Sequence, residues 1–596
     1  MMKKSSINLF EHYSYIPYKT SSSHLDRFID RKDYKILYDE FSRILLITNK
    51  KLINKYIRND FFHSSENLII LEPHMLAFNM LLKSITLERI IDENPKKKII
   101  IDVFNEELNL NNRFLNQYAY IASKIGNPFE INLKGKCNVE YTNDPSVKNK
   151  IIGILNFKLK YILYEAYKKI GFKKDKFYFG YGRNYITREI EQELYFKGFS
   201  QINIESIKKD YKIFNSIDLK HDSDYQYVFD LISDVFTDFL NKHLKSDKVI
   251  NALNSVFTEL FLKNIKELLE NKFFLRNHIK SLKKKYKVEF ILSNGLFHNV
   301  GKSIYDAMKF NQIKVFSTEH GLTCGISKDS LPHKFSNESN TSDILFCYNN
   351  SSVNTHHKNN SSKTIFFPVG AHSFSKKTQN KSILRYYYRR RFKIKNRCIF
   401  YVSHNIELNV GKYYPYTKPC PEIFEDEKVL ISTLGKVNKE VLYKSYPTKQ
   451  YLDDRNNYIN KLLKKHKNIK NIETEEDFRY MRNVADIVIT QSSESTLEWC
   501  IGLNVPLIFL DSDFYEPLEN EDVKNAFKKS FFFFNYDKDG WEIDLIRFLN
   551  KPYKEILSLW KQKQKYRNQY DEVYFLSKGK KAGKIGATLI LDEFKK

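Results

Sequence analysis

The sequence predicts an α/β protein with two Rossmann-like domains that face a cleft, and three observations lead to this prediction. The chain has 596 residues, which is too many for one hydrophobic core. From residue 288 onward, short apolar segments typical of strands alternate with helical segments. Polar turns follow several of these strands, and open α/β sheets bind their ligands beyond the carboxyl ends of the strands.

The first domain is predicted to cover residues 1–384. Its expected strands are the apolar runs at residues 44–48, 68–71, 98–103, 177–182, 201–204, 288–292, 313–317, 344–348 and 364–368. Residues 222–286 place apolar side chains at helical spacing, so we expect a helical insertion at about 205–286. The first domain would therefore combine a Rossmann-like sheet with additional helices.

The second domain is predicted to cover residues 385–545. Its expected strands lie at residues 398–403, 441–444, 486–490 and 505–510, and a run of phenylalanines at 531–534 predicts one more buried strand. The chain is helical and strongly charged from residue 541 onward. We expect the tail, residues 546–596, to pack back on the first domain.

Residues 485–510 form a unit of strand, polar turn, helix and strand, and they carry the main prediction of a binding site. Ser495 or Thr496 can cap the helix, with Glu498 placed to reach back toward the cap. Free N–H groups and the helix dipole favour an anion such as a diphosphate at such a turn. An ordinary capped helix is the alternative, and this segment alone leaves both open. The candidate binding residues of this segment are Gln491, Ser492, Ser493, Ser495, Thr496 and Glu498.

Further polar turns extend the predicted site. The candidates that they supply are Asn294, Gly295, Glu319, His320, Gly321, His404, Gly435, Lys436, Lys444, Tyr446 and Pro447. His320 stands at a strand end and precedes a glycine, so a ligand could approach it closely. It could act as a general base near neutral pH or donate a hydrogen bond to a phosphate. A structural turn residue is the alternative for a lone histidine.

The composition is strongly basic, with 98 Lys and Arg against 71 Asp and Glu and a net charge of +27. Nucleic acid, an anionic membrane surface and phosphorylated substrates all suit such a charge. The basic residues are spread along the whole chain, which favours a compositional bias over a binding stripe. Residues 385–397 are basic and aromatic, and we interpret them as the lead-in to the second domain; contact with anionic lipid head groups is a minor alternative, slightly favoured over nucleic acid.

Cysteine spacing and hydropathy bound the cellular setting. The six cysteines lack metal-ligand spacing and are too sparse for a disulfide framework, which fits a reducing cytoplasm. The sequence shows no apolar stretch of about 20 residues, so we expect at most peripheral contact with the inner face of a membrane.

Two motifs imitate sites for other ligands. Residues 295–303 resemble a phosphate-binding P-loop, but five residues separate Gly295 from the Gly-Lys pair where that loop has four. Asp511 and Asp513 could hold a divalent metal beside a diphosphate, although no other carboxylate cluster is placed to support them. We therefore predict no metal and no cofactor, with any nucleotide acting as a substrate.

The order of the motifs resembles that of a known group of enzymes. The motifs are Glu319-His320-Gly321, the Lys444 to Pro447 turn, Ala485 to Thr490, the Ser492 to Glu498 turn and Gly502 to Pro506. Together they are similar to bacterial glycosyltransferases of the GT-B fold, of the surface-polysaccharide type that builds capsules and the O-antigens of lipopolysaccharide. They also resemble teichoic-acid-type glycerophosphotransferases. The resemblance covers about residues 288–510.

The resemblance implies a division of labour between the two domains. The second domain would bind the nucleotide sugar, with Lys444, Tyr446 and Pro447 at the nucleotide, the serines and Thr496 at its phosphates, and Glu498 at a cap or the ribose. Glu319, His320 and Gly321 would face the transferred group, and a glycan or lipid-linked glycan would be the acceptor. Many relatives have histidine where this chain has Tyr446, which weakens the glycerophosphotransferase reading most.

Other functions stay open at this point. A polyol-phosphate transferase or a nucleotide-sugar epimerase could use the same fold. A non-catalytic protein that binds nucleotide sugars or nucleic acid is the alternative from another class, suggested by the net charge.

Overall fold

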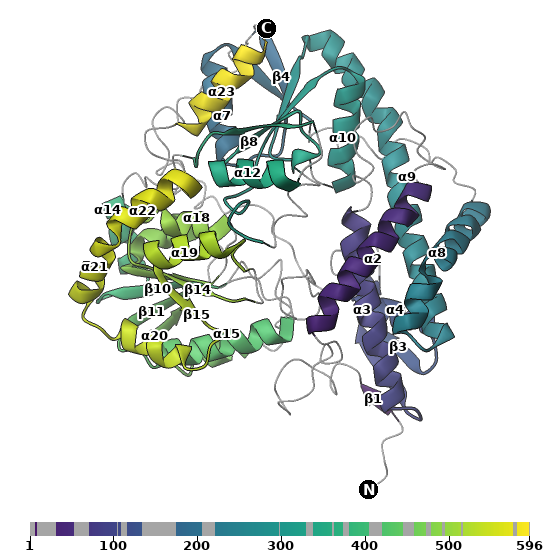
Figure 1. The fold of residues 1–596 in the computed structure, drawn as a ribbon, viewed down its shortest axis with the longest axis horizontal. Coiled ribbons are helices and arrows are strands. Elements are labelled where there is room, and N and C mark those ends of the chain that lie inside the picture. Colours follow the sequence, from purple (N-terminus) through teal and green to yellow (C-terminus); the bar gives the residue numbers. More distant parts are fainter. Residues whose placement is uncertain are drawn as a thin grey trace.

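The structure is a computed structural model. It describes residues 6–8, 31–52, 71–103, 105–108, 116–133, 175–204, 221–296, 298–328, 338–359, 363–372, 381–403, 420–444, 458–472, 478–491, 495–513, 517–575 and 581–594. These residues form three units, which Figure 1 shows at the lower right, at the top and at the lower left.

The first unit is largely helical and has its own core. Its elements are β1 (Ser6–Asn8), α2 (Arg31–Leu52), α3 (Leu71–Glu93), β2 (Lys98–Val103), η3 (Asn105–Leu108), α4 (Gln117–Ile125), β3 (Phe129–Leu133), α8 (His221–His243) and the first half of α9 (Asp247–Tyr286). The three strands form a parallel sheet in the order β1-β2-β3. The ring of Phe41 lies 5.4–6.0 Å from those of Phe78, Phe236, Phe239 and Phe257, which joins four helices.

The strand expected at residues 44–48 is wrong, because this segment lies within α2. Leu37, Phe41 and Leu45 are buried at a spacing of four residues, which is helical spacing. The Thr48 hydroxyl donates to the Ile44 carbonyl, as helical threonines do. The predicted insertion also differs: α8 and the first half of α9 share a core with α2, α3 and α4.

The second unit is a Rossmann-like domain. Its elements are β4 (Lys176–Tyr181), α7 (Tyr185–Phe196), β5 (Phe199–Asn203), β6 (Phe290–Ser293), α10 (His298–Phe310), β7 (Lys314–Thr318), β8 (Ile344–Cys347), α12 (Asn350–Asn359) and β9 (Ile365–Pro368), joined by α23 (Ala582–Glu593) from the chain's end. Its six parallel strands run in the order β5-β4-β6-β7-β8-β9. Phe290 and Phe316 face one core and Ile291 and Val315 face another, so both faces are covered.

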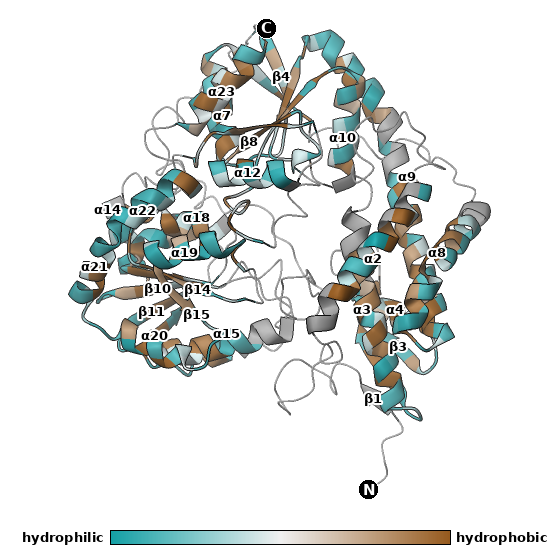
Figure 2. Cartoon of the chain, viewed as in Figure 1, coloured by the Kyte–Doolittle hydropathy of each residue, from teal (hydrophilic) through white to brown (hydrophobic). Residues whose placement is uncertain are grey.

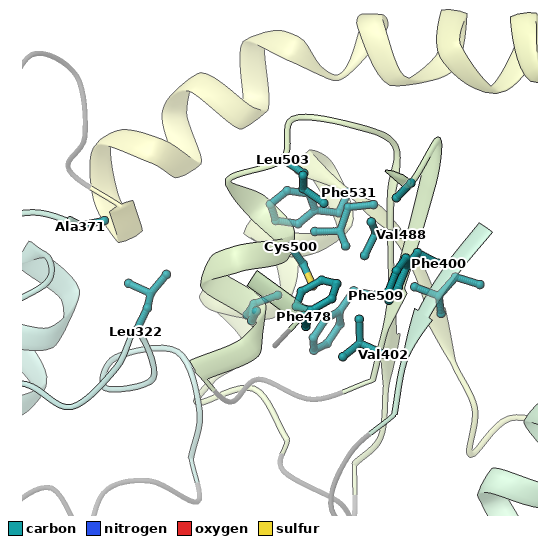
Figure 3. Packing of buried hydrophobic residues seen from close by; sticks show 14 of the residues in the cluster. Leu322, Ala371, Phe400, Val402, Phe478, Val488, Cys500, Leu503, Phe509 and Phe531 are labelled. Atoms are coloured by element: carbon teal, nitrogen blue, oxygen red, sulfur yellow. The ribbon is translucent and has the colours of Figure 1, made fainter. Parts of the chain in front are cut away.

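The third unit is a second Rossmann-like domain. Its elements are α14 (Lys381–Arg391), β10 (Cys398–Val402), α15 (Cys420–Gly435), β11 (Glu440–Lys444), α16 (Tyr458–Leu463), β12 (Ile469–Asn471), α17 (Phe478–Met481), η6 (Arg482–Val484), β13 (Ile487–Thr490), α18 (Ser495–Ile501), β14 (Leu507–Asp511), α19 (Glu521–Ser530), β15 (Phe532–Asn535), α20 (Trp541–Leu549), α21 (Tyr553–Gln562), α22 (Gln564–Tyr570) and the π-helical turn η7 (Asp571–Phe575). The strands run in parallel in the order β12-β11-β10-β13-β14-β15. Figure 3 shows Cys500 and Leu503 of the α18 segment packed toward Phe400, Val488 and Phe509 of this sheet.

Two Rossmann-like domains with parallel six-stranded sheets define the GT-B architecture, so the predicted fold class is confirmed. Figure 2 shows largely hydrophobic strands enclosed by helices whose outer faces are hydrophilic. None of the helices in the described ranges is both long and apolar enough to cross a membrane.

The chain crosses back to the second unit later than residue 546. Helices α20 to α22 stay with the third unit, where Phe532 packs on Phe548 and Phe531 on Trp560. The return occurs at η7, whose Tyr574 and Phe575 carbonyls accept hydrogen bonds from Asn349 and Ala371. Helix α23 then packs on α7, with Gly583 against the Glu189 backbone.

The long helix α9 connects the first unit to the second. Its 40 residues extend over about 60 Å. Leu253 and Phe257 belong to the first core, while Leu275 and Ile279 belong to the core beneath β6 and β7. One continuous helix therefore contributes to two separate cores.

Candidate functional site

The two Rossmann-like sheets turn their carboxyl edges toward each other. The Arg479 guanidinium donates to the Tyr185 hydroxyl at 2.9 Å, and Thr355 donates to Glu519 at 3.0 Å. A short antiparallel bridge joins Ser327 to Leu518. Each of these residues lies in a segment that follows a strand of its own sheet. The polar turns of the two domains are therefore on facing edges.

Both sheets also place a topological switch point at this boundary. The chain order reverses between β4 and β6 in one sheet and between β10 and β13 in the other. Ligands of open α/β sheets bind at such points, where neighbouring connections leave the edge in opposite directions. Asn184 follows β4 and Asn294 follows β6, and their side chains meet across the first switch point at 2.8 Å.

A chain of hydrogen bonds runs from a helix cap to His320. The Asn184 carbonyl oxygen Oδ1 accepts from the Thr187 amide at 2.8 Å, so its Nδ2 points away from helix α7. This Nδ2 donates to the Asn294 Oδ1, to Thr318 Oγ1 at 2.9 Å and to the Glu319 carbonyl at 2.7 Å. The Asn294 Nδ2 is then left facing His320 Nδ1 at 3.1 Å. Gly295, with φ of 79°, turns the backbone directly after Asn294.

This chain fixes the tautomer of His320. An amide nitrogen donates and does not accept, so Nδ1 of the neutral imidazole must be the acceptor and Nε2 must carry the proton. The orientation of both asparagines follows from the backbone amide at Thr187, which can only donate. His320 is exposed, and the neutral ring presents an N–H donor rather than a basic nitrogen at Nε2. Of the two roles predicted for His320, the geometry favours hydrogen bonding to an anionic oxygen.

We expect nitrogen-15 NMR of histidine-labelled protein to show neutral His320 protonated at Nε2. Asn294→Asp should move the proton to Nδ1, because a carboxylate can only accept. Asn525→Asp, on the exposed face of α19, is the matched control and should leave the His320 signals in place. A wild-type ring protonated at Nδ1 would contradict the assignment.

Glu319 lies beside His320 in sequence but points into the protein. Its carboxylate is fully buried and accepts from the Tyr348 amide at 2.7 Å and from the Ser352 hydroxyl. His356 Nε2 lies 3.1 Å from the same carboxylate. Residues that alternate along an extended segment face opposite sides, which separates Glu319 from His320. Glu319 is therefore placed to hold the turn in position, whereas the sequence predicted it to face the transferred group.

Glu319 also belongs to a group that could hold a metal ion. Ligand atoms of Glu319, Cys324 and His356 lie within 4.8 Å of one another, and all three side chains are buried. His356 Nε2 is 3.6 Å from the Cys324 sulfur, so the histidine bridges the other two. The hydrogen bonds from Tyr348 and Ser352 already satisfy much of the carboxylate. The three side chains thus form a buried hydrogen-bonded group behind the His320 turn.

In the second Rossmann-like domain, Gln491 belongs to a buried network below the predicted turn. Its Nε2 donates to the Tyr401 hydroxyl at 2.8 Å and to Glu427 at 3.2 Å. Tyr401, Tyr443 and Ser403 all donate to the same carboxylate. Burial raises the pKa of Glu427, and these hydrogen bonds offset only part of that rise. Gln491 therefore fixes the end of β13 from beneath.

Glu498 connects the two domains. Its Oε1 lies 3.0 Å from Nε2 of His372, which follows β9, and both side chains are almost fully buried. Tyr348 also hydrogen-bonds Glu498, and burial together with the charge of Glu498 raises the Tyr348 pKa well above its usual value. The start of α18, which carries the predicted phosphate turn, is thus tied to the first Rossmann-like domain.

An aromatic cluster surrounds this connection. Tyr185 stacks on His372 at 4.7 Å, and both rings contact Trp499, at 5.0 Å and 4.8 Å. The Arg479 guanidinium lies 5.2 Å from the Tyr185 ring and 5.7 Å from the Trp499 ring. The sequence prediction missed Asn184, Tyr185, His372, Glu427 and Arg479. Asn184 and His372 each follow a predicted strand within four residues, which is a signal that could have found them.

The structure places some of the remaining predicted residues at strand ends, while others lie outside the described ranges. Gly321 follows β7, and Lys444, buried at the end of β11, and half-buried Thr496 lie at the carboxyl edge of the second sheet. Ser495 begins α18. Five predicted residues lie outside the described ranges: His404, Tyr446, Pro447, Ser492 and Ser493.

Gly435 and Lys436 do not belong to the site. They end α15 and precede β11, which places them at the amino edge of the sheet. Gly435 lies directly against the ring of His466, in the segment that precedes β12. The prediction failed here because a turn before a parallel strand lies at the opposite edge from a turn after one.

A lysine lies between the two aspartates that could have held a metal. The Lys524 ammonium is 2.9 Å from Asp511 and 2.6 Å from Asp513. Burial alone would lower the lysine pKa, but these two partners raise it to about 12. The ammonium thus supplies the positive charge in this loop. The P-loop-like segment at residues 295–303 does not present its lysine to a phosphate either, because Lys302 is buried within α10.

Comparisons with known proteins find structural neighbours only. No family model matches the chain. No curated protein matches it either. A glycosyltransferase from Rickettsia africae ESF-5 is 14% identical with a TM-score of 0.40, and the match covers 71% of this chain and 98% of that one. A UDP-GlcNAc 2-epimerase from Neisseria meningitidis is 12% identical with a TM-score of 0.37, covering 70% and 99%. MurG from Acinetobacter baumannii is 13% identical with a TM-score of 0.32, covering 66% and 94%.

Proposed function

We propose that the chain is a glycosyltransferase that moves a sugar from a nucleotide-activated donor to a surface-glycan acceptor. The observation that carries this proposal is the pair of switch points on facing carboxyl edges, one of which presents His320 through an ordered chain of hydrogen bonds. The order of the motifs along the two domains supports it as well.

In the proposed reaction, the bond between the sugar C1 and the donor diphosphate breaks, and a bond from C1 to an acceptor hydroxyl oxygen forms. The hydroxyl proton is released to solvent, and negative charge accumulates on the departing diphosphate. A preorganised N–H donor is most effective where charge develops, because it needs no reorientation during the reaction. His320 would donate from Nε2 to this charge.

The second domain would hold the nucleotide beyond β11 and β13. Lys444 would border the nucleotide, and the turn that leads into α18 would receive the diphosphate, as predicted from the sequence. Glu498 and His372 would keep the start of α18 at a fixed position relative to the first Rossmann-like domain. Donor and acceptor would then meet between two edges that are already aligned.

A thermal-shift panel of nucleotides and nucleotide sugars tests the proposal. A ligand that binds only the folded state at about 100 times its Kd stabilises it by about 2.7 kcal/mol, which raises the melting midpoint by several degrees. We expect one base to produce this shift, and its nucleotide sugar to release free nucleotide only when an acceptor glycan is added.

The same panel separates the other functions. Interconversion of the nucleotide sugar without an acceptor would identify an epimerase. Release of a nucleoside monophosphate from a CDP-polyol would identify a polyol-phosphate transferase. A shift without turnover for any acceptor would identify a binding protein, and no shift with any nucleotide would overturn the proposal.

A further inference from the structure

Helix α14 presents an apolar and aromatic stripe on its outer face. Ile383 is 65% exposed, Tyr386 67% and Tyr387 38%. These residues stand at helical spacing and continue into exposed Arg390 on the same face. Leu384 and Tyr388, on the opposite face, are buried. A stripe of this kind has no role in the core.

The orientation of α14 is fixed by one aspartate. Arg385 Nη2 lies 2.7 Å from Asp486, Arg389 Nη1 3.2 Å and Arg397 Nη1 2.8 Å. Arg385 also donates to the Asn483 and Ala485 carbonyls, both at 2.9 Å. The helix therefore cannot rotate to bury Ile383 without breaking these bonds. The stripe is a permanent surface feature.

The surface next to the end of α14 is basic. Arg391, Lys393 and Lys395 are exposed and lead into β10. The segments that precede β11 and β12 add further exposed lysines on the same amino edge of the sheet: Lys436, Lys464, Lys465 and Lys467. Glu440 on this edge already binds Lys470 at 2.9 Å and accepts from the Lys395 and Asn396 amides. Positive charge is therefore in excess here.

We propose that this surface, formed by the outer stripe of α14 and the basic amino edge of its sheet, docks on an anionic lipid bilayer. Tyrosine and isoleucine side chains gain from the boundary between head groups and acyl chains, while lysine and arginine are attracted to anionic head groups. Nucleic acid would satisfy the positive charges but would offer nothing to an exposed isoleucine. The surface lies at the edge opposite the candidate site and does not depend on the proposed reaction.

Docking by the amino edge would set the height of the site above the bilayer. The strands of this sheet are three to five residues long, which is about 10–17 Å. The facing carboxyl edges would thus open away from the lipid surface. A chain that extends from the bilayer could reach them, whereas a group buried among the head groups could not.

Vesicle co-sedimentation tests the proposal. The full chain should bind vesicles of phosphatidylcholine mixed with anionic phosphatidylglycerol at least about tenfold more strongly than phosphatidylcholine alone, and salt should weaken the binding. Each lysine or arginine near an anionic surface contributes about fivefold in affinity, so the double variant Arg390→Glu/Arg391→Glu should lose about 25-fold or more. Ile383→Ser/Tyr386→Ser should lose several-fold without any change in thermal stability.

Matched variants keep the result interpretable. Lys245→Glu/Lys248→Glu makes the same change in net charge on the exposed surface of the first unit, and Ile543→Ser removes an exposed isoleucine from α20. Both should bind vesicles as the wild type does. Equal binding by Arg390→Glu/Arg391→Glu, or no binding of wild type to anionic vesicles, would overturn the proposal. Stronger binding to single-stranded DNA that ignores Ile383→Ser/Tyr386→Ser would overturn it in favour of nucleic acid.

Discussion

Replacing His320 with alanine should lower kcat about 10²- to 10³-fold, which is the usual cost of removing one preorganised donor. The KM for the nucleotide sugar should change much less, because the donor acts mainly on charge that develops during the reaction. The folded state should be unaffected, since the side chain is exposed. Steady-state kinetics with the nucleotide sugar found in the thermal-shift panel measure both parameters.

His357→Ala is the matched control for this experiment. His357, on α12, is also exposed and packs edge-on against Phe366 of β9, away from the switch points. It should keep wild-type turnover. Near-normal turnover in His320→Ala would remove the catalytic assignment, and unfolding of that variant in a melting curve would make a structural role the better explanation.

Replacing Asp486 with alanine should destabilise the third unit by about 2–4 kcal/mol, because the buried Cys398 amide and the partly buried Arg385 and Arg389 lose their acceptor. The buried carboxylate binds three arginines and accepts from the Cys398 amide at 2.9 Å. The melting midpoint should fall by roughly 10 °C. Calorimetry or denaturant unfolding measures the change.

The same residue predicts a pH dependence. Burial alone would raise the Asp486 pKa, but the Cys398 amide, Arg397 and Arg385 outweigh burial and hold it below its usual value. A lowered folded-state pKa gives stability that is present above about pH 4 and is lost as the pH falls through the folded pKa. Asp486→Asn should lose part of this acid sensitivity.

Asp544→Asn, at an exposed pair with Arg547, is the control for Asp486→Ala and should cost under about 1 kcal/mol. Equal stabilities for Asp486→Ala and Asp544→Asn would refute the role given to Asp486.

The sequence predicts the two Rossmann-like sheets well because their strands are buried on both faces. The runs at Cys398–Val402, Ile487–Thr490 and Leu507–Asp511 are apolar except for the last residue of the second and third, and polar residues follow each of them. Such short continuous runs are typical of parallel sheets. The first unit is harder, because Ile44 to Thr48 is also an apolar run with β-branched residues. Only the wider spacing of Leu37, Phe41 and Leu45 indicates a helix there.

The candidate site shows a different limit. Strand-end position correctly places Asn294 and His320 together, and their side chains lie 3.1 Å apart. Strand-end position alone does not show that Glu319 points into the protein while His320 points outward, because that depends on the direction of each side chain. The contacts of Tyr185, His372 and Trp499 join segments far apart in the chain, and one sequence carries no signal for such pairing. Position along a strand can be predicted, but partners across a domain boundary cannot.

The order in which the chain is made has a consequence for its assembly. The core of the first unit needs α8 and the first half of α9, which are synthesised after strands β4 and β5 of the next unit. Translation adds about 5–20 residues per second, so roughly ten seconds or more pass between the synthesis of Phe78 and that of Phe257, which packs on Phe41. The second unit waits longer still, because α7 is covered by α23 at the end of the chain. Only the third unit is nearly contiguous in sequence. The first core can close once the first half of α9 is made, whereas the surface of α7 stays open until α23, residues 582–593, has been synthesised, so chaperones would have the longest time to act on that surface.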